Sequence, residues 1–158
     1  MKDLVRLLTF LGSKSFRDRS KRMLGMTQNS YVDNALKRFK IGHSKRGFLS
    51  MRYEVKLSNK QSSKTDEELK RMSNVLYALA IGNIQNVAQC TRLDVAYALS
   101  VSNRYQVRVG EAHWTVVKTV LKYQRRTKDI FLAYGSGELI LEGYNDASLQ
   151  SDDDDAKS

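Results

Sequence analysis

The chain has 158 residues, of which 41% are apolar and 28% charged, and its formal net charge is +10. This balance is typical of a globular protein with a core and excludes disorder along the whole chain. The apolar stretches are far shorter than the roughly 20 residues of a membrane helix, and the single cysteine excludes an internal disulfide. We therefore expect an intracellular protein, cytoplasmic or nuclear, that is not secreted and does not contact a membrane.

The charge is spread unevenly along the chain. Residues 1–46 contain twelve lysines and arginines against three acids, whereas residues 129–158 contain eight acids against one lysine. A basic N-terminal part favours a polyanionic partner, and nucleic acid phosphates would bind it in a salt-dependent way. The alternative is a basic but inert solvated surface.

The first forty residues predict a β-hairpin followed by a helix. Residues 7–16 have the composition of a strand that carries Gly12, and residues 23–26 form its partner after a charged turn. Thr27 then offers a helix N-cap, the following apolar residues have helical spacing, and Gly42 is the expected stop.

A linker and a long helix are predicted next. Residues 43–64 are rich in Ser and Lys and predict an extended linker with one short strand at 53–57. Thr65 and Glu68 form a capping box, which predicts a helix that runs to about Ala88.

Two further helices should follow. Thr91 or Asp94 is suited to cap the first, and residues 111–127 form a clearly amphipathic second. Beside the apolar stripe of the second helix lies a row of cations that can follow phosphates: Lys118, Lys122 and Arg125. An ordinary solvated helix face is the alternative.

The C-terminal part predicts strands and an acidic tail. Residues 130–134 and 138–145 have strand composition, with a glycine-rich turn between them, and Asp152–Asp155 should be solvated. The fold class expected for the whole chain is therefore α+β.

Catalytic chemistry has little support in the residue pattern. Asp146 follows a predicted strand, where carboxylates often hold magnesium, but metal-assisted phosphoryl transfer needs several converging carboxylates. The alternative for Asp146 is a turn residue. His43 and His113 stand alone, and His113 is expected to be an ordinary helix residue rather than a ligand. We expect no cofactor.

Several stretches, in the same order, resemble copia-type retrotransposon Pol polyproteins. They are MKDL at 1–4 with FLG at 10–12, RDRSKRMLG at 17–25, YVDNALKRF at 31–39, CTRLDVAYALS at 90–100, GEAHW at 110–114, RTKD at 126–129 and LEGYNDAS at 141–148. The resemblance implies a chain that runs from a reverse transcriptase into a ribonuclease H domain.

This resemblance implies four segments. Residues 1–42 would be the end of the polymerase palm, a hairpin with a helix, and residues 43–64 a linker. Residues 65–128 would be thumb and connection helices, which grip nucleic acid in such enzymes. Residues 129–158 would be the truncated start of ribonuclease H, a terminal β-hairpin that has lost its partner strands, with a disordered acidic tail.

The resemblance also bears on catalysis. Asp146 matches the first metal-binding carboxylate of ribonuclease H, which would hold Mg²⁺ only if the rest of that domain were present. We expect the other metal ligands of both parent active sites to lie outside residues 1–158, so that the chain itself is not an enzyme.

Prolines that the family commonly has are replaced in this chain. Ser50, Leu76 and Leu93 stand at such positions, and Val109 lies where an Asn-Pro-Gly turn is usual. We hypothesise that the sequence comes from a decaying element.

The expected function is therefore an inactive fragment of reverse transcriptase and ribonuclease H. It would keep weak, salt-dependent affinity for an RNA–DNA hybrid or duplex through Lys118, Lys122, Arg125 and Arg126. Two alternatives stay open: an independent basic nucleic-acid-binding or regulatory module without enzymatic activity, and an enzyme with a cryptic site. The sequence does not decide the oligomeric state.

Overall fold

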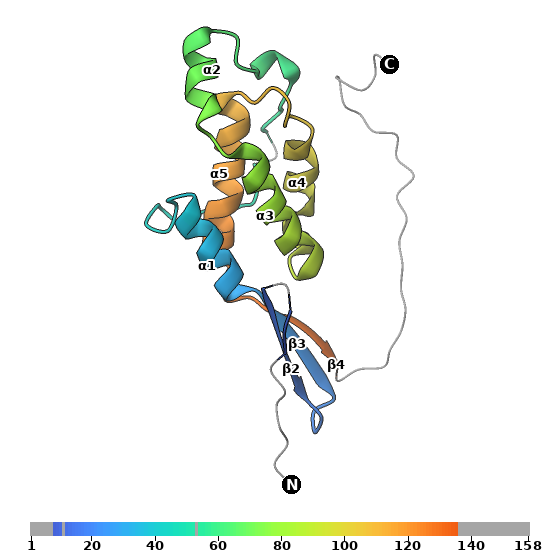
Figure 1. Ribbon diagram of the computed structural model, residues 1–158. Coiled ribbons are helices and arrows are strands. Elements are labelled where there is room, and N and C mark those ends of the chain that lie inside the picture. The colour runs from blue at the N-terminus through green and yellow to red at the C-terminus, as the bar shows by residue number, and fades with distance from the viewer. Residues whose placement is uncertain (1–7, 11, 53, 136–158) are drawn as a thin grey trace.

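The computed structural model describes residues 8–10, 12–52 and 54–135. The helices gather at one end, and an antiparallel sheet extends from the other (Figure 1). This mixture of helices and sheet is compatible with the expected α+β class.

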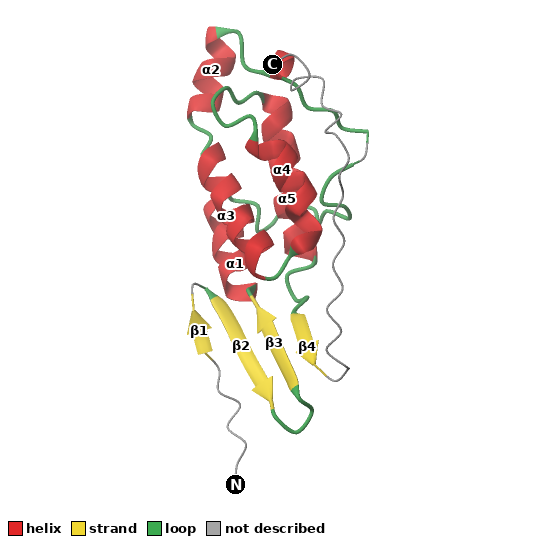
Figure 2. Cartoon of the chain, turned by 90° about the vertical axis from the view of Figure 1, so that its right-hand side faces the viewer, coloured by secondary structure: helices red, strands yellow, loops and turns green. Residues whose placement is uncertain are grey.

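The sheet has the strand order β1-β2-β3-β4, and all its pairs are antiparallel (Figure 2). The strands are β1 (Leu8–Phe10), β2 (Ser13–Asp18), β3 (Met23–Thr27) and β4 (Leu132–Gly135). The predicted hairpin of β2 with β3 is confirmed. A single strand over 7–16 is wrong, because Gly12 adopts a φ of +80° and the chain reverses there, so that Phe10 pairs with Ser13.

The fourth strand has a partner that the sequence did not predict. Residues 130–145 were expected to lack partner strands, but β4 pairs with β3 in a register that sets Tyr134 opposite Leu24. Two polar contacts hold the start of this segment against α1 (Asn29–Arg38): Lys128 Nζ lies 3.0 Å from an Asp33 carboxylate oxygen, and Asn29 donates to Asp129 at 3.3 Å. The predicted strand at 138–145 and the acidic tail lie outside the described residues.

Helix α1 begins and ends close to the predicted positions, but by other means. Its N-cap is Gln28 rather than Thr27. At its end the Ile41 N–H donates to the Leu36 carbonyl and the Lys40 N–H to the Lys37 carbonyl, with Lys40 at a φ of +56°. This hydrogen-bond pattern is a Schellman motif, so Lys40 and not Gly42 stands at the left-handed position that stops the helix.

The predicted long helix is two helices. The capping box is confirmed at the start of α2 (Asp66–Ser73), where the Glu68 N–H donates to Thr65 Oγ1 at 3.3 Å. Helix α2 ends at Ser73, and Leu76 has φ −78° and ψ 58°, outside the helical region, before α3 (Tyr77–Cys90) begins. Prediction of one helix to Ala88 was wrong, because apolar spacing continues across a break that only the backbone reveals.

The last helices include the best-predicted element. A short 3₁₀ turn, η2 (Leu93–Val95), leads into α4 (Ala96–Asn103), and α5 (Glu111–Arg126) follows. The predicted caps of α4 are wrong, because the side chains of Thr91 and Asp94 bind elsewhere: Thr91 donates to Gln28, and Asp94 binds Arg92. The prediction of α5 at 111–127 is confirmed almost to the residue.

The predicted linker at 43–64 is packed rather than extended. It contains the 3₁₀ turn η1 (Asn59–Gln61), and its described residues 54–57 form no strand. Leu57 is buried against Tyr105 and Val116, and the Tyr105 hydroxyl donates to the Leu57 carbonyl at 2.9 Å.

The main core lies where α1, α3, α4 and α5 meet. Its most deeply buried apolar residues are Ala80, Ile81, Ile84, Val87, Val95, Ala98, Val117, Val120 and Leu121. None of the described helices is long and apolar enough to cross a membrane.

Candidate nucleic-acid interface

Helix α5 is the rigid support of the predicted binding surface. Val117, Val120 and Leu121 are at most 1% exposed, which confirms three positions of the predicted apolar stripe. The fourth position, Trp114, is partly buried. Side chains that project from the opposite side of this helix therefore start from a fixed backbone.

The first turn of α5 is held by a buried histidine. The Gly110 N–H donates to His113 Nδ1 at 2.9 Å, and His113 Nε2 lies 3.2 Å from the Ser58 carbonyl oxygen. Because Nδ1 accepts, the ring proton sits on Nε2 and is donated to Ser58. Burial lowers the pKa of His113, and its ring stacks on Tyr105 at a centroid distance of 4.3 Å. His113 is therefore a packed helix residue, whereas the sequence did not distinguish a packed from an exposed position.

The four predicted cations follow one side of α5. Their spacing from position 118 is four, seven and eight residues, so they share a helix face that the core does not cover. Lys118, Lys122 and Arg125 are partly buried, and Arg126 is exposed. Contact of these residues with nucleic acid stays a prediction.

The loop at 43–50 adds to this face, which sequence reasoning missed. The Gly47 N–H donates to the Lys122 carbonyl at 3.0 Å, so the loop lies directly on α5. A Cβ atom at Gly47 would lie 2.9 Å from the Tyr123 backbone nitrogen, so position 47 has no space for a side chain. The exposed cations Lys45 and Arg46 are thereby brought beside the α5 cations.

An exposed aromatic ring lies in the same loop. Phe48 is 76% exposed, and the Arg126 guanidinium stands 3.9 Å from the centroid of its ring. Aromatic rings and arginines next to each other on a basic surface are typical of sites where bases stack and phosphates bind. No signal in the sequence alone pointed to this pair, because the residues are far apart in the chain.

A buried arginine supports the C-terminal end of α5. Arg92 is 4% exposed and donates to both carboxylate oxygens of Asp94, at 2.9 and 2.7 Å. It also donates to the backbone carbonyl and the hydroxyl of Thr127, at 2.9 and 2.7 Å. Its guanidinium lies 5.5 Å from the ring centroid of Tyr123, whose hydroxyl donates to Asp94 at 2.7 Å.

The electrostatics of this cluster favour both charges. Burial opposes the charge of Arg92, but the hydrogen bonds and charge of Asp94 outweigh it and raise the arginine pKa. Burial likewise opposes ionisation of Asp94, but hydrogen bonds from Arg92 and Tyr123 outweigh it and lower the carboxyl pKa. Arg92 is therefore a structural cation that holds η2 to the end of α5.

The described carboxylates are dispersed. Asp146 lies outside the described residues, and in the described part of the chain no group of three or more His, Cys, Asp or Glu side chains is placed to hold a metal ion. Asp33, Glu68 and Asp94 bind Lys128, a helix cap and Arg92, respectively.

The chain is similar to known transposon proteins. It is 37% identical over all 158 residues to the retrovirus-related Pol polyprotein from transposon TNT 1-94 of Nicotiana tabacum, of which it covers 12%. It is also 37% identical over 81 residues, half of its length, to the retrovirus-related Pol polyprotein from transposon RE2 of Arabidopsis thaliana, of which it covers 5%. The chain thus spans a small part of both polyproteins.

A third similarity is to an effector protein rather than to a transposon polyprotein. Over 88 residues, 55% of the chain, it is 33% identical to the secreted RxLR effector protein 161 of Plasmopara viticola, of which it covers 62%. No protein-family model matches the chain, and no solved structure gives a significant match.

Proposed function

We propose that this chain, which is derived from a retrotransposon Pol polyprotein, binds nucleic acid and does not itself catalyse a reaction. The observation that carries the proposal is the row of Lys118, Lys122, Arg125 and Arg126 on one anchored helix. A cationic row on a fixed backbone can follow successive phosphates without ordering a flexible segment first.

The segment of Pol is proposed from the sequence blocks. Their order is that of a copia-type element between the polymerase active site and ribonuclease H, with the helices at 65–128 as thumb and connection. In such a segment, the partner of the α5 face is an RNA–DNA hybrid or a duplex.

Neighbouring side chains support binding on the α5 face. Lys45 and Arg46 are exposed beside α5, so the positive surface is broader than the helix alone. Phe48 with Arg126 adds a platform for an unpaired base. Phosphate contacts supply affinity without sequence preference, so we expect weak and salt-dependent binding.

The test is a titration of a labelled RNA–DNA hybrid, measured by fluorescence anisotropy at several salt concentrations. For the whole chain we expect the logarithm of the association constant to fall linearly with the logarithm of salt concentration. The double variant Lys122→Gln/Arg125→Gln should bind more weakly, with a slope shallower by about 1 to 2, because each phosphate contact contributes about 0.9.

The matched control is Arg19→Gln/Lys21→Gln. It removes the same charge from two exposed residues in the loop between β2 and β3, at the far end of the sheet from the helices. Equal losses in the two double variants would show that only net charge matters. Binding by the whole chain that does not respond to salt would refute phosphate contact altogether.

The non-catalytic part of the proposal has its own test. The chain is incubated with magnesium and either a primed RNA template or an RNA–DNA hybrid, and extension and cleavage are measured. We expect neither product. Cleavage that disappears in Asp146→Asn would overturn the proposal and favour an enzyme with a cryptic site.

A second candidate is an independent basic module that regulates another process through binding. Similarity to the RxLR effector favours it, because that protein is covered over 62% of its length, against 12% and 5% for the two polyproteins. A folded chain that shows no binding to the hybrid at low salt would remove the first function and favour the second.

A further inference from the structure

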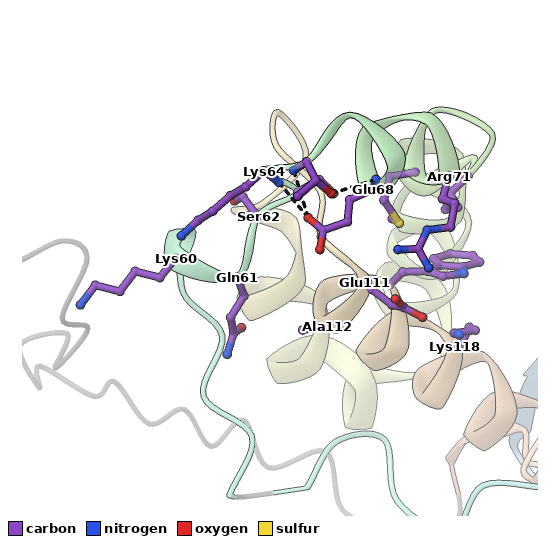
Figure 3. A pocket seen from close by; sticks show the side chains of 15 residues that line it. Lys60, Gln61, Ser62, Lys64, Glu68, Arg71, Glu111, Ala112 and Lys118 are labelled. Carbon is purple, nitrogen blue, oxygen red and sulfur yellow. Dashed lines mark hydrogen bonds between the residues drawn. The ribbon is translucent and has the colours of Figure 1, made fainter.

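A cavity of about 610 Å³ lies between α2, the loop that precedes it and the first turns of α5 (Figure 3). Its size falls within the range of small-ligand sites, which is roughly 300 to 1,000 Å³. Of the predicted cationic row, only Lys118 lines it.

Part of the cavity lining is apolar and includes an indole ring. Met72, Val75 and Trp114 belong to this apolar part. Trp114 meets the rings of Phe39 and Tyr77 edge to face, at centroid distances of 6.3 and 6.4 Å. These contacts fix the indole at the edge of the core, where it is partly buried and still lines the cavity. A fixed aromatic ring of this kind can stack a nucleobase.

The rim of the cavity is mainly cationic. Four cations line it, Lys60, Lys64, Arg71 and Lys118, against the two carboxylates Glu68 and Glu111. Figure 3 shows Arg71 and Lys118 on the same side as Glu111, with the lysines of the loop opposite.

One of the two carboxylates is already engaged. Glu68 accepts hydrogen bonds from the backbone N–H groups of Lys64 and Thr65, at 2.9 and 3.4 Å, and these bonds lower its pKa. In the wall, the hydroxyl oxygen of Ser62 is buried and has no hydrogen-bond partner within the described part of the chain. An anion that enters the cavity would therefore meet several cations.

We propose that this cavity binds a nucleotide, with the phosphate at Arg71 and Lys118 and the base against Trp114. A free nucleotide and the terminal nucleotide of a single strand carry the same recognition elements. The site goes beyond the proposed grip on a hybrid, because its apolar lining and most of its cations are not part of the α5 row.

Trp114 is the single tryptophan of the chain and lines this cavity, so its fluorescence reports on a ligand that enters it. The full chain is titrated separately with adenosine 5′-monophosphate, adenosine, inorganic phosphate and a short single-stranded oligonucleotide with a 5′-phosphate. We expect saturable quenching by the mononucleotide and by the oligonucleotide, at least tenfold weaker binding of adenosine, and no quenching by phosphate alone. The ratio of the affinities for mononucleotide and oligonucleotide identifies the natural source.

The variant that tests the site is Arg71→Gln, and Lys21→Gln is its charge-matched control in the loop after β2. We expect the apparent dissociation constant for the mononucleotide to rise about tenfold in Arg71→Gln, which corresponds to about 1.4 kcal/mol, and to stay unchanged in Lys21→Gln. Absence of saturable quenching in the folded chain would overturn the proposal, and so would equal binding of adenosine and its monophosphate.

The failure of this site is distinguishable from the failure of hybrid binding. Lys122→Gln/Arg125→Gln should weaken the hybrid and leave mononucleotide quenching intact, whereas Arg71→Gln should do the reverse. If each of these variants lost hybrid binding as well as mononucleotide quenching, that result would contradict a separate pocket.

Discussion

Asp94→Ala should destabilise the fold by far more than the loss of a surface ion pair. The substitution removes two of the four hydrogen bonds that Arg92 donates and leaves a guanidinium that is 4% exposed without a counter-ion. Breaking a fully buried pair costs about 3 to 5 kcal/mol. The Asp94 side chain is 41% exposed, and Thr127 still accepts two bonds, so the expected cost is about 2 to 3 kcal/mol.

The assay is urea unfolding followed by Trp114 fluorescence, with the slope against denaturant checked for constancy. Asp94→Asn keeps one acceptor for Arg92 and should cost clearly less than Asp94→Ala. Tyr123→Phe, combined with Asp94→Ala, should give less than the sum of the two single effects, because both remove the same hydrogen bond. A cost of Asp94→Ala below about 0.5 kcal/mol, the value of an exposed pair, would refute the role assigned to Arg92.

Three further predictions concern stability. Burial lowers the pKa of His113 from 6.5, so below pH 6.5 the unfolded chain takes up a proton that the folded chain does not. The free energy of unfolding should therefore fall as the pH drops below 6.5, and chemical unfolding of His113→Gln should lose this slope. Lys40→Gly should raise the free energy of unfolding by about 0.5 to 1 kcal/mol, because it relieves the left-handed conformation at φ +56°; a drop in denaturation midpoint would contradict this. Leu76→Pro should stabilise the fold by about 0.4 to 1 kcal/mol, because Leu76 already has a φ of −78° and is 56% exposed. Thermal melting measures the change, and a lower melting temperature would show that the break between α2 and α3 needs leucine.

Helix α5 was predictable because burial of its apolar face determines both its position and its length. Its apolar spacing, its length and its buried face agree, and the cations at Lys118, Lys122 and Arg125 follow from the same spacing. The helix over 65–88 failed because periodicity reports which side is buried and does not report a local change of ψ at Leu76. The prediction that Asp94 caps α4 was wrong for another reason, because its carboxylate has a stronger partner in the buried guanidinium of Arg92.

Contacts between segments that lie far apart in the chain could not be predicted from the sequence. Pairing of β4 with β3 joins residues more than a hundred positions apart, and no local pattern in either strand names its partner. The same holds for Gly47, whose small size is explained only by the backbone of Tyr123. Phe48 was inside a predicted linker, and only the packing of that loop on α5 places it beside Arg126.

The blocks that carry the family resemblance meet one another in space. Arg92, from the block CTRLD, binds Thr127, from the block RTKD, while Lys128 and Asp129 of the latter contact Asp33 and Asn29 of α1. In the described part of the chain these motif residues therefore join α1, the start of η2 and the end of α5. Fold maintenance alone accounts for their presence, so they carry no argument for catalysis. Lys45 and Arg46 are exposed beside Lys122, so these cations are the residues at which the proposed binding is best tested.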